Sequence, residues 1–343
     1  MEKSLFIGID FSKKTFDVSL IDGNNLNGIP GYKQFDNTKE GCNQLLKWVK
    51  LWSKIPVSEW LFCGEHTGLY SVLLSEFLIK KNLFVWLENP LQIKLSTGIK
   101  RDKNDKVDSR EIALYALRFQ DKAKESQLSD KSLKSLELLL GFRDRLIGNK
   151  HALLVSAAEL RDVLNRDVTA RYIYEQSQKD IERINKEIKC VEAKMKEVVD
   201  SNDAIKETYE VVSSIKGVAL INTVAIIVAT KNFSRFENSR QFACYAGMAP
   251  FGKQSGTSIK TGPHVSHLAN KRIKTLLTQA AQCAIRHNSD LKQYYTRKVA
   301  EGKNKWIVLN NVRNKLIHCI FALVRDKQLY QEGFLQHMEK SIA

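Results

Sequence analysis

The stretch SLFIGIDFSKKTFDVSLI (residues 4–21) predicts two short strands joined by a tight turn. Apolar residues alternate with other residues along 5–9 and again along 16–20, which is the period of a strand with one buried face. The polar residues at 12–14 separate the two runs. We expect this pair of strands at the N-terminus to form part of a larger sheet.

The residues that follow extend this pair into a mixed sheet. Short apolar runs predict further strands, and apolar residues at helical spacing predict helices between them. We therefore expect an α/β domain over residues 1–125. The predicted strands are 32–35, 60–63 and 83–87, and the predicted helices are 41–52 and 70–80.

The middle of the chain has a helical pattern and no proline between residues 128 and 200. Between Ile181 and Val198, apolar residues are spaced alternately by three and four positions, which is a heptad pattern of about three repeats. We predict a helical coiled-coil region over 126–204 that mediates dimerisation. The alternative is a long helix packed on its own domain. The heptad residues are Ile181, Ile184, Ile188, Val191, Met195 and Val198.

A third, mainly α-helical domain is expected over 205–330, followed by a tail at 331–343. An apolar run predicts a buried helix near 218–229, and a shorter apolar element follows it. Residues 251–268 are rich in Gly, Ser, Thr and Lys and predict a loop. Amphipathic helices are expected over 269–287 and 305–325.

The composition excludes disorder and indicates a polyanionic partner. Hydrophobic residues make up 43% of the 343 residues, and 54 Lys and Arg stand against 38 Asp and Glu, a net charge of +16. Residues 251–343 hold 16 of those basic residues and five acidic ones. Such a surplus favours nucleic acid, or an anionic membrane surface, over small acidic substrates.

A membrane role is disfavoured, because the most apolar stretch, Val218 to Thr230, is too short to span a bilayer. The N-terminus has no signal-peptide pattern. The six scattered cysteines form no C-x-x-C pair and predict reduced, mostly buried thiols rather than a zinc site. We therefore expect a cytoplasmic protein.

Four carboxylates form the first candidate site. Asp10 and Glu65 each end a predicted strand, and Asp105 and Asp108 are spaced to share one helical face. Carboxylate oxygens are the ligands that Mg²⁺ prefers, and paired ions can stabilise both oxygens of a phosphoryl transfer.

Each acid also has an ordinary explanation. Asp10 could be a turn residue, and Glu65 could be a solvated acid in a loop. Asp105 and Asp108 could be acids that stabilise a helix N-terminus and have no other role. Asp102, three residues before Asp105, is a further acidic candidate that the pattern does not exclude.

The second candidate site is the Gly-rich stretch 250–262, PFGKQSGTSIKTG. Such a loop can bring backbone N–H groups against a phosphate, and a serine within it could be a nucleophile if activated. Surface loops of ordinary function often have this composition. His264 and His267 lack further ligands nearby, so we expect loop or phosphate contacts from them rather than metal binding.

Together these residues resemble the DEDD insertion-sequence transposases related to the Piv DNA invertase, a family of bridge-RNA-guided recombinases. The N-terminal signature is Gly8-Ile9-Asp10, then Glu65-His66-Thr67-Gly68, then Lys103-Asn104-Asp105-Lys106-Val107-Asp108, with Ser109 in place of the family's alanine. The C-terminal signature is Phe236, then Arg240-Gln241-Phe242-Ala243-Cys244-Tyr245-Ala246-Gly247-Met248-Ala249-Pro250, then Gln254-Ser255-Gly256. The later basic stretch of the family is similar to residues 269–274.

The resemblance implies a RuvC-like, RNase H-type fold for the N-terminal domain and a C-terminal transposase domain that carries a catalytic serine, Ser255. It implies that Asp10, Glu65, Asp105 and Asp108 hold Mg²⁺, while Asp102 is a bystander. It also implies donor and target DNA, a structured bridge RNA, and a homodimer that assembles into a tetramer. The expected nucleic-acid contacts are Lys253, Lys260, Lys271, Arg272 and Lys274.

Two other functions stay open on the residues alone. A RuvC-type nuclease or Holliday-junction resolvase needs the carboxylates but not Ser255. A non-catalytic nucleic-acid-binding protein needs only the basic charge. Substitution of Ser255 separates the first two functions, and substitution of Asp10 separates both enzymes from the binding protein.

Overall fold

A computed structural model of the chain describes residues 3–26, 28, 30–66, 68–96, 104–128, 130–255, 259–265 and 269–334, and for 251–255 and 259–264 it describes the backbone only. The chain divides into two compact units, residues 1–128 and 129–343. Each unit is described by itself below.

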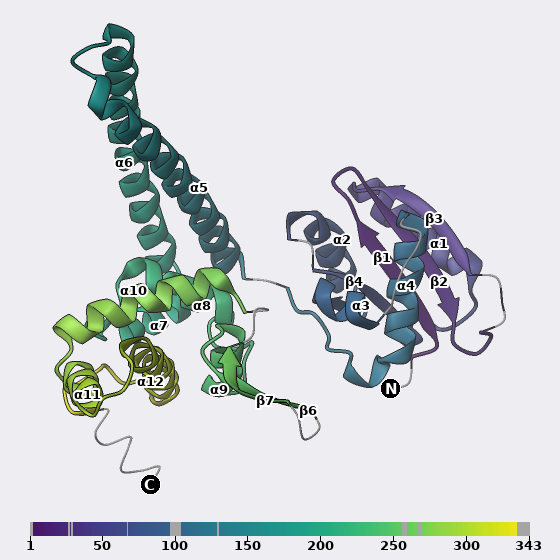
Figure 1. Cartoon of the computed structure of the whole chain (residues 1–343). Coiled ribbons are helices and arrows are strands. Elements are labelled where there is room, and N and C mark those ends of the chain that lie inside the picture. Colours follow the sequence, from purple (N-terminus) through teal and green to yellow (C-terminus); the bar gives the residue numbers. More distant parts are fainter. Residues whose placement is uncertain are drawn as a thin grey trace. The chain divides into compact units, whose positions relative to one another are not determined.

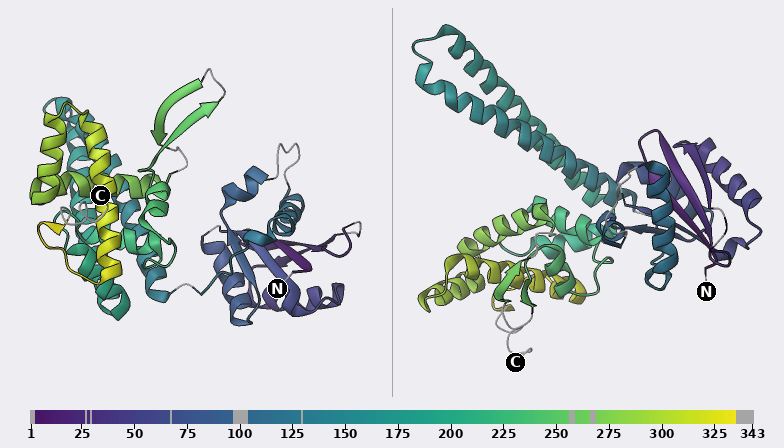
Figure 2. Two further views of the ribbon diagram at one scale, coloured as in Figure 1. Left: turned by 90° about the horizontal axis from the view of Figure 1, so that it is seen from below. Right: turned by 45° about the vertical axis from the view of Figure 1, so that its right-hand side comes forward.

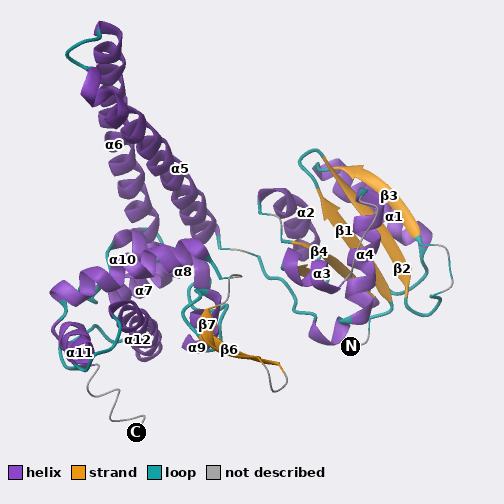
Figure 3. Cartoon of the chain, in the orientation of Figure 1, coloured by secondary structure: helices purple, strands orange, loops and turns teal. Residues whose placement is uncertain are grey.

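Unit 1 is built on a five-stranded mixed sheet with the order β3-β2-β1-β4-β5 (Figures 1 and 3). β1 pairs antiparallel with β2, and β2 does so with β3, whereas β4 runs parallel to β1 and β5 parallel to β4. All five predicted strands are confirmed. Their bounds are β1 Leu5–Phe11, β2 Thr15–Asp22, β3 Gly31–Asp36, β4 Trp60–Glu65 and β5 Val85–Glu88.

Helices cover both faces of this sheet. One face packs against α1 (Lys39–Trp52) and α2 (Leu69–Lys80), and the other packs against α4 (Asp105–Arg118) and α3 (Pro90–Ser96). The alternation in β1 and β2 causes this division, because successive side chains of a strand point to opposite faces. The short turns η1 (Val57–Glu59) and η2 (Gln120–Lys122) complete the unit.

α4 approaches the sheet unusually closely at Gly8. A Cβ atom at this position would lie 2.2 Å from the backbone oxygen of Ser109 and 2.3 Å from the backbone nitrogen of Ala113. Real Cβ atoms do not tolerate such distances, so a residue without a side chain is required here. The close approach brings the first turn of α4 beside the end of β1.

Unit 2 begins with a helical hairpin of α5 (Lys131–Leu160) and α6 (Val168–Asp200), joined through η3 (Arg161–Val163). The two helices run side by side in every view (Figure 2). Five of the six heptad residues are buried and Val198 is partly buried. Most of the seam belongs to the same hydrophobic cluster as Leu136, Leu140 and Leu146 of α5. In the single chain, α5 thus packs against the heptad seam of α6. This is the arrangement of the alternative, a long helix packed on its own domain.

The remaining helices continue the same hydrophobic core, so the middle and C-terminal segments share one compact unit. α12 is the one helix in the described part of the chain that is long and apolar enough to cross a membrane, and half of its most apolar window is buried. It is a core helix of unit 2. The bounds are α7 Asp203–Ser213, α8 Leu220–Thr230, α9 Ser239–Tyr245, α10 Lys271–His287, α11 Ser289–Ala300 and α12 Lys305–Asp326.

Two predictions need correction. The expected loop over 251–268 contains an antiparallel strand pair, β6 (Pro250–Ser255) and β7 (Ile259–Val265), with an irregularity between Phe251 and Lys253. The alternation of apolar residues in these strands is too weak to predict them. The cysteines are free, as expected, but only three are buried. The exposed ones are Cys190, Cys244 and Cys283.

Candidate active site

The first two acids of the candidate site lie at the same end of the sheet. Asp10 is the penultimate residue of β1, and Glu65 is the last residue of β4. Because β1 and β4 run parallel, their carboxyl ends share one edge of the sheet. Asp10 alternates with the buried Ile9 and Phe11, so it belongs to the face that packs against α4.

The other two acids lie in the first turn of α4. Asn104 caps this helix, and its side-chain oxygen accepts a hydrogen bond of 2.8 Å from the backbone N–H of Val107. The cap begins the helix at Asp105, so Asp105 and Asp108 both lie one turn or less from its N-terminus. The approach of α4 to Gly8 then places this turn beside Asp10.

The electrostatics of Asp10 show that the four acids are neighbours. The pKa of Asp10 is raised from 3.8 to about 6, first because the carboxyl is withdrawn from solvent and then because other carboxylates repel its charge. The repelling residues, in order of effect, are Asp105, Asp108, Glu65 and Asp17. All four carboxylates predicted from the sequence are therefore brought together.

These residues have the donor chemistry for a hard divalent cation. Neighbouring carboxylates that raise the proton affinity of Asp10 create a negative potential that also favours a small cation. Among the described residues, however, no three acidic, His or Cys side chains form a group that already converges on one ion. The described carboxylates are thus neighbours, but their side chains do not form a complete set of ligands around one ion.

Asp17 is a fifth carboxylate that the sequence analysis did not identify. It lies opposite Asp10 in the β1–β2 ladder and is 1% exposed. Tyr32 donates its hydroxyl to Asp17 Oδ1 at 2.6 Å, and Gln34 Nε2 donates to both carboxylate oxygens at 3.1 and 3.2 Å. The signal was present, because a charged residue between Phe16 and Val18 must face the side of the sheet that carries Asp10.

Asp17 also affects Tyr32. The hydrogen bond to Asp17, together with burial and the charges of Asp17 and Asp105, raises the pKa of Tyr32 to about 12. Tyr32 thus keeps its proton and remains the donor. Lys106 of α4 lies over the same ring, with Nζ 5.2 Å from the ring centre.

Ser109, which replaces the alanine of the family signature, contacts a serine of the sheet. Ser109 is fully buried, and its hydroxyl lies 2.8 Å from the hydroxyl of Ser19 on β2. Ser109 Oγ also donates to the backbone oxygen of Lys106 at 3.1 Å. A buried hydroxyl needs a partner, and Ser19 supplies one. The pair ties α4 to β2 at the residue that directly follows Asp108.

Ser255 lies in unit 2, as the last residue of β6, paired with Ile259 of β7. The ends of this hairpin are held by several contacts. The backbone N–H of Asn270 donates to the backbone oxygen of Tyr245 at 2.9 Å, and Asn270 Nδ2 donates to the Tyr245 hydroxyl at 2.7 Å. Asn310 Nδ2 donates to the backbone oxygen of Met248 at 3.0 Å. The chain before β6 is therefore fastened to α12 and to the chain after β7.

The predicted nucleic-acid contacts divide into two groups. Lys253 and Lys260 lie in the hairpin, where the structure describes only the backbone. The others lie in the first turn of α10, where Lys271 is exposed and Lys274 partly buried. Arg272 Nε forms a 2.7 Å ion pair with Asp144 of α5, so part of its charge is compensated within unit 2. Asp102 and His267 lie outside the described residues.

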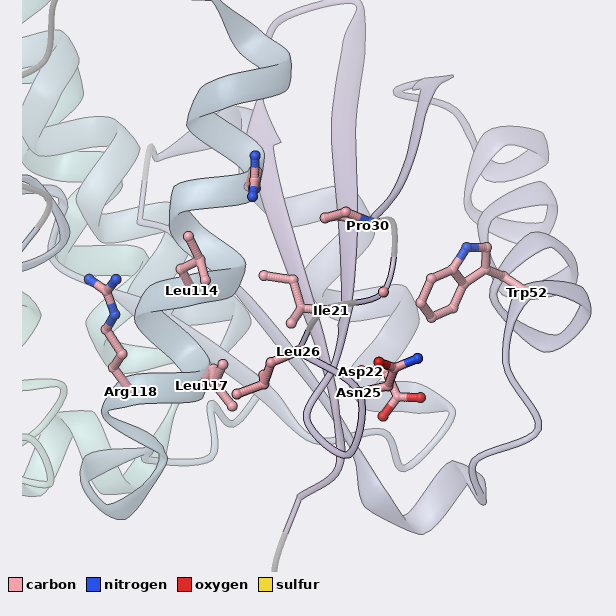
Figure 4. A pocket seen from close by; sticks show the side chains of 11 residues that line it. Ile21, Asp22, Asn25, Leu26, Pro30, Trp52, Leu114, Leu117 and Arg118 are labelled. Carbon is pink, nitrogen blue, oxygen red and sulfur yellow. The ribbon is translucent and has the colours of Figure 1, made fainter.

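Unit 1 also has a cavity of about 470 Å³ that is separate from the carboxylates (Figure 4). It lies near the end of β2, and Asp22, which lines it, pairs with Leu5 at the start of β1. Asp10 is near the opposite end of β1. The cavity is lined by Ile21, Asp22, Asn25, Leu26, Gly28, Pro30, Trp52, Arg110, Leu114, Leu117 and Arg118.

An α/β unit with carboxylates gathered at one sheet edge, joined to a strongly basic helical unit, is the organisation of an enzyme that acts on nucleic acid. The family is identified by two sequence models. Residues 7–166 match the model of DEDD transposases of the IS110 type, and residues 209–296 match the transposase model of the IS116/IS110/IS902 family. The chain belongs to this family of DEDD transposases.

Similar proteins support the same assignment over nearly the whole length. The chain is 23% identical to the pilin gene-inverting protein of Moraxella bovis over 331 residues, which cover 95% of this chain and 98% of that protein. The corresponding protein of Moraxella lacunata matches to the same extent. An uncharacterised protein of insertion element IS110 from Streptomyces coelicolor is 30% identical over 121 residues, 35% of this chain and 30% of that protein. The chain is thus a DNA recombinase of the transposase and DNA-invertase type.

Proposed function

We propose that the chain is the RNA-guided recombinase of an insertion sequence, and that it cleaves DNA through a covalent phosphoserine intermediate formed by Ser255. The observation that carries the proposal is the environment of Asp10, whose pKa is raised to about 6 first by withdrawal from solvent and then by the charges of the surrounding carboxylates. An environment that disfavours a charge costs folding free energy, so a function that requires the negative charge is the best explanation for it.

The residues that would hold Mg²⁺ are Asp10, Glu65, Asp105 and Asp108. When bound, a divalent ion supplies a positive charge that stabilises the oxygens of a phosphoryl transfer. The chain's own contribution is to hold the four acids on two rigid supports, a sheet edge and a capped helix. Asp17 is hydrogen bonded to Tyr32 and Gln34, so it belongs to the support of the site rather than to its ligands.

Ser255 would attack a DNA phosphate. The hydroxyl of Ser255 loses its proton, the Oγ–P bond forms as the P–O bond to the departing deoxyribose oxygen breaks, and the departing oxygen takes up a proton. The phosphoserine link keeps the bond energy for strand exchange. A serine hydroxyl is a weak nucleophile at neutral pH, which is why it needs an activating site. The position of Ser255 at the end of a strand whose base is fastened by Asn270 and Asn310 supports a positioned nucleophile.

A structured guide RNA would select both DNA partners, and the working form would be a homodimer that pairs into a tetramer in the cytoplasm. These parts of the proposal rest on the resemblance to bridge-RNA-guided recombinases. Guide pairing leaves the protein to bind nucleic-acid backbone, which suits a net charge of +16. Because α5 covers the heptad seam of α6, other surfaces would form the dimer.

The test is detection of a protein–DNA adduct on a denaturing gel, with Mg²⁺, guide RNA and cognate DNA. We expect an adduct with the wild-type chain and with Gln254→Ala, the neighbouring control in β6, and none with Ser255→Ala or Asp10→Asn. Cleaved DNA without an adduct, at the same level in Ser255→Ala, would instead identify a RuvC-type nuclease. An adduct that persists in Asp10→Asn would remove Asp10 from the site.

A further inference from the structure

A row of polar side chains crosses the sheet of unit 1 on the face that packs against α4. In the strand register, Asp10 of β1 pairs with Asp17 of β2, and Asp17 pairs with Gln34 of β3. Side chains that are directly opposite in neighbouring strands lie on the same face of a sheet. The row therefore runs from the carboxylate site to β3, which is an edge strand of the sheet.

Asp17 is the buried member of this row, and no cation is paired with it. Its side chain is 1% exposed, and its hydrogen-bond donors are the hydroxyl of Tyr32 and the amide of Gln34, which are both neutral. Within the described part of the chain it forms no ion pair, and Lys106 lies over the Tyr32 ring instead. A carboxylate that only accepts hydrogen bonds, all from neutral groups, keeps its negative charge, and burial strengthens the effect of that charge on its neighbours.

The charge of Asp17 acts on Asp10. The Cα atoms of directly opposite residues in antiparallel strands are about 4.5–5.5 Å apart. Asp17 is accordingly one of the carboxylates that raise the pKa of Asp10, after Asp105, Asp108 and Glu65. A negative potential that favours a proton at Asp10 also favours a divalent cation there.

The hydrogen bonds of Asp17 direct its carboxylate away from the other four acids. Oδ1 accepts from Tyr32 and Gln34, and Oδ2 accepts from Gln34. Both donors belong to β3, on the far side of β2 from Asp10. The contacts therefore hold the oxygens of Asp17 towards the edge strand while its charge stays beside the site.

We propose that Asp17 is a positioning residue for the divalent cation, and that its buried charge raises the affinity of the carboxylate site for Mg²⁺ without coordinating the ion. The inference rests on the proposed function of Asp10, Glu65, Asp105 and Asp108, and it adds a fifth acid that acts through Asp10. Tyr32 and Gln34 keep the Asp17 carboxylate in place, so the site receives its charge but not its oxygens.

The experiment measures the affinity of the full chain for Mn²⁺ by isothermal titration calorimetry, without DNA or RNA. Mn²⁺ prefers the same oxygen ligands as Mg²⁺. We expect Asp17→Asn to weaken binding at least about tenfold, as is usual when a residue that supports metal ligands is replaced. Asparagine can still accept from Tyr32, and the exposed Gln34 amide can rotate to accept from it. The urea midpoint of unit 1 in EDTA should therefore equal or exceed that of the wild type.

Gln34→Lys is a second test, which leaves the buried carboxylate in place. Gln34 is exposed, so a lysine is tolerated there, and its ammonium group would compensate the charge of Asp17. We expect Mn²⁺ binding to weaken about three- to tenfold, less than in Asp17→Asn because solvent screens an exposed cation. Gln44→Lys is the matched control, because it makes the same change at an exposed position of α1, on the other face of the sheet. It should change the Kd less than twofold.

An unchanged Mn²⁺ affinity in Asp17→Asn and Gln34→Lys would overturn the inference, and so would an equal effect of Gln44→Lys, which would reflect the net charge of the unit. A lower urea midpoint in Asp17→Asn, together with an unchanged affinity in Gln34→Lys, would leave Asp17 with a structural role only and would also overturn it.

Asp10→Asn distinguishes failure of this inference from failure of the proposed function. It should remove Mn²⁺ binding. A wild-type chain that binds no Mn²⁺, or an Asp10→Asn chain that binds it with wild-type affinity, would refute the metal site itself. Binding that is lost in Asp10→Asn but unaffected in Asp17→Asn and Gln34→Lys would refute only the role of Asp17.

Discussion

Burial of the Asp10 carboxyl, together with the charges of the neighbouring carboxylates, should destabilise unit 1 in the absence of metal, and Asp10→Asn should relieve this cost. The pKa of Asp10 is raised from 3.8 to about 6 in the folded chain. Each pKa unit corresponds to about 1.4 kcal/mol, so the full shift corresponds to about 3 kcal/mol. Because Asp10 is only partly buried, solvent screening reduces this figure, and we expect about 2 kcal/mol.

The pH dependence has a definite sign. Well below the ordinary pKa of 3.8, Asp10 is protonated in both the folded and the unfolded chain, and the cost is absent. Between about pH 4 and 6, the folded chain holds a proton that the unfolded chain has released, so the free energy of unfolding falls as the pH rises. Asparagine has no such titration. The stability advantage of Asp10→Asn should therefore grow from near zero at about pH 3 to about 2 kcal/mol at pH 7.

Tryptophan fluorescence during urea unfolding can measure this difference in the full chain. Four of the five tryptophans lie in unit 1, and the fifth, Trp306, is 72% exposed and changes its surroundings little on unfolding. The fluorescence transition therefore reports unit 1. The measurements are made in EDTA, and Asp121→Asn, which removes an exposed acid of the same unit, is the control.

A stability difference between Asp10→Asn and wild type that does not vary between pH 4 and 7 would refute the reasoning. So would a difference of equal size in Asp121→Asn, because the effect would then reflect the net charge of the unit. A loss of stability in Asp10→Asn at pH 7 would mean that the Asp10 carboxylate makes favourable contacts that outweigh its repulsion.

Three further perturbations test other parts of the structure. Gly8→Ala places a Cβ atom 2.2 Å from the Ser109 oxygen, so we expect a loss of at least about 3 kcal/mol in the urea transition of unit 1, and an unchanged midpoint would contradict the close packing of α4. Ile188→Ala should lower the free energy of unfolding, followed by circular dichroism, by about 2–4 kcal/mol, and should leave the molecular mass from light scattering unchanged. A lower mass would instead indicate that the heptad seam forms an intermolecular coiled coil. Asn270→Ala removes the hydrogen bond to Tyr245 and should slow adduct formation at least tenfold while DNA affinity stays constant, with rescue by Asn270→Gln not expected because the longer side chain misplaces the donor.

Much of unit 1 could be predicted because its signals are local. Alternation along residues 5–9 and 16–20 predicted β1 and β2, and polar residues at the strand ends predicted Asp10 and Glu65 as neighbours. The α/β character of this unit and the helical character of the rest are confirmed. Asp17 was not predicted because the apolar alternation of β2 identifies only one of its two buried faces, and Asp17 lies on the other.

The remaining features could not be predicted because one-dimensional patterns do not identify the partner of a surface. The heptad seam of α6 is a real apolar stripe, but periodicity does not say whether α5 or a second chain covers it. The β6–β7 pair has few apolar residues to alternate, so composition predicted a loop where backbone pairing forms strands. The partner of Ser109, a buried serine 90 positions away, could not be found from spacing at all.

The two units divide the chemical requirements of recombination between them. Unit 1 has a small net charge and concentrates negative charge at the sheet edge around Asp10, where a nucleic-acid backbone is repelled unless cations intervene. Unit 2 holds most of the positive surplus of the chain, so it should supply most of the electrostatic attraction for a nucleic-acid backbone. Loss of a carboxylate should then abolish cleavage without loss of affinity for DNA. A chain in which Asp10→Asn lowered the affinity would have to bind DNA through the carboxylate edge itself, against its own electrostatic field.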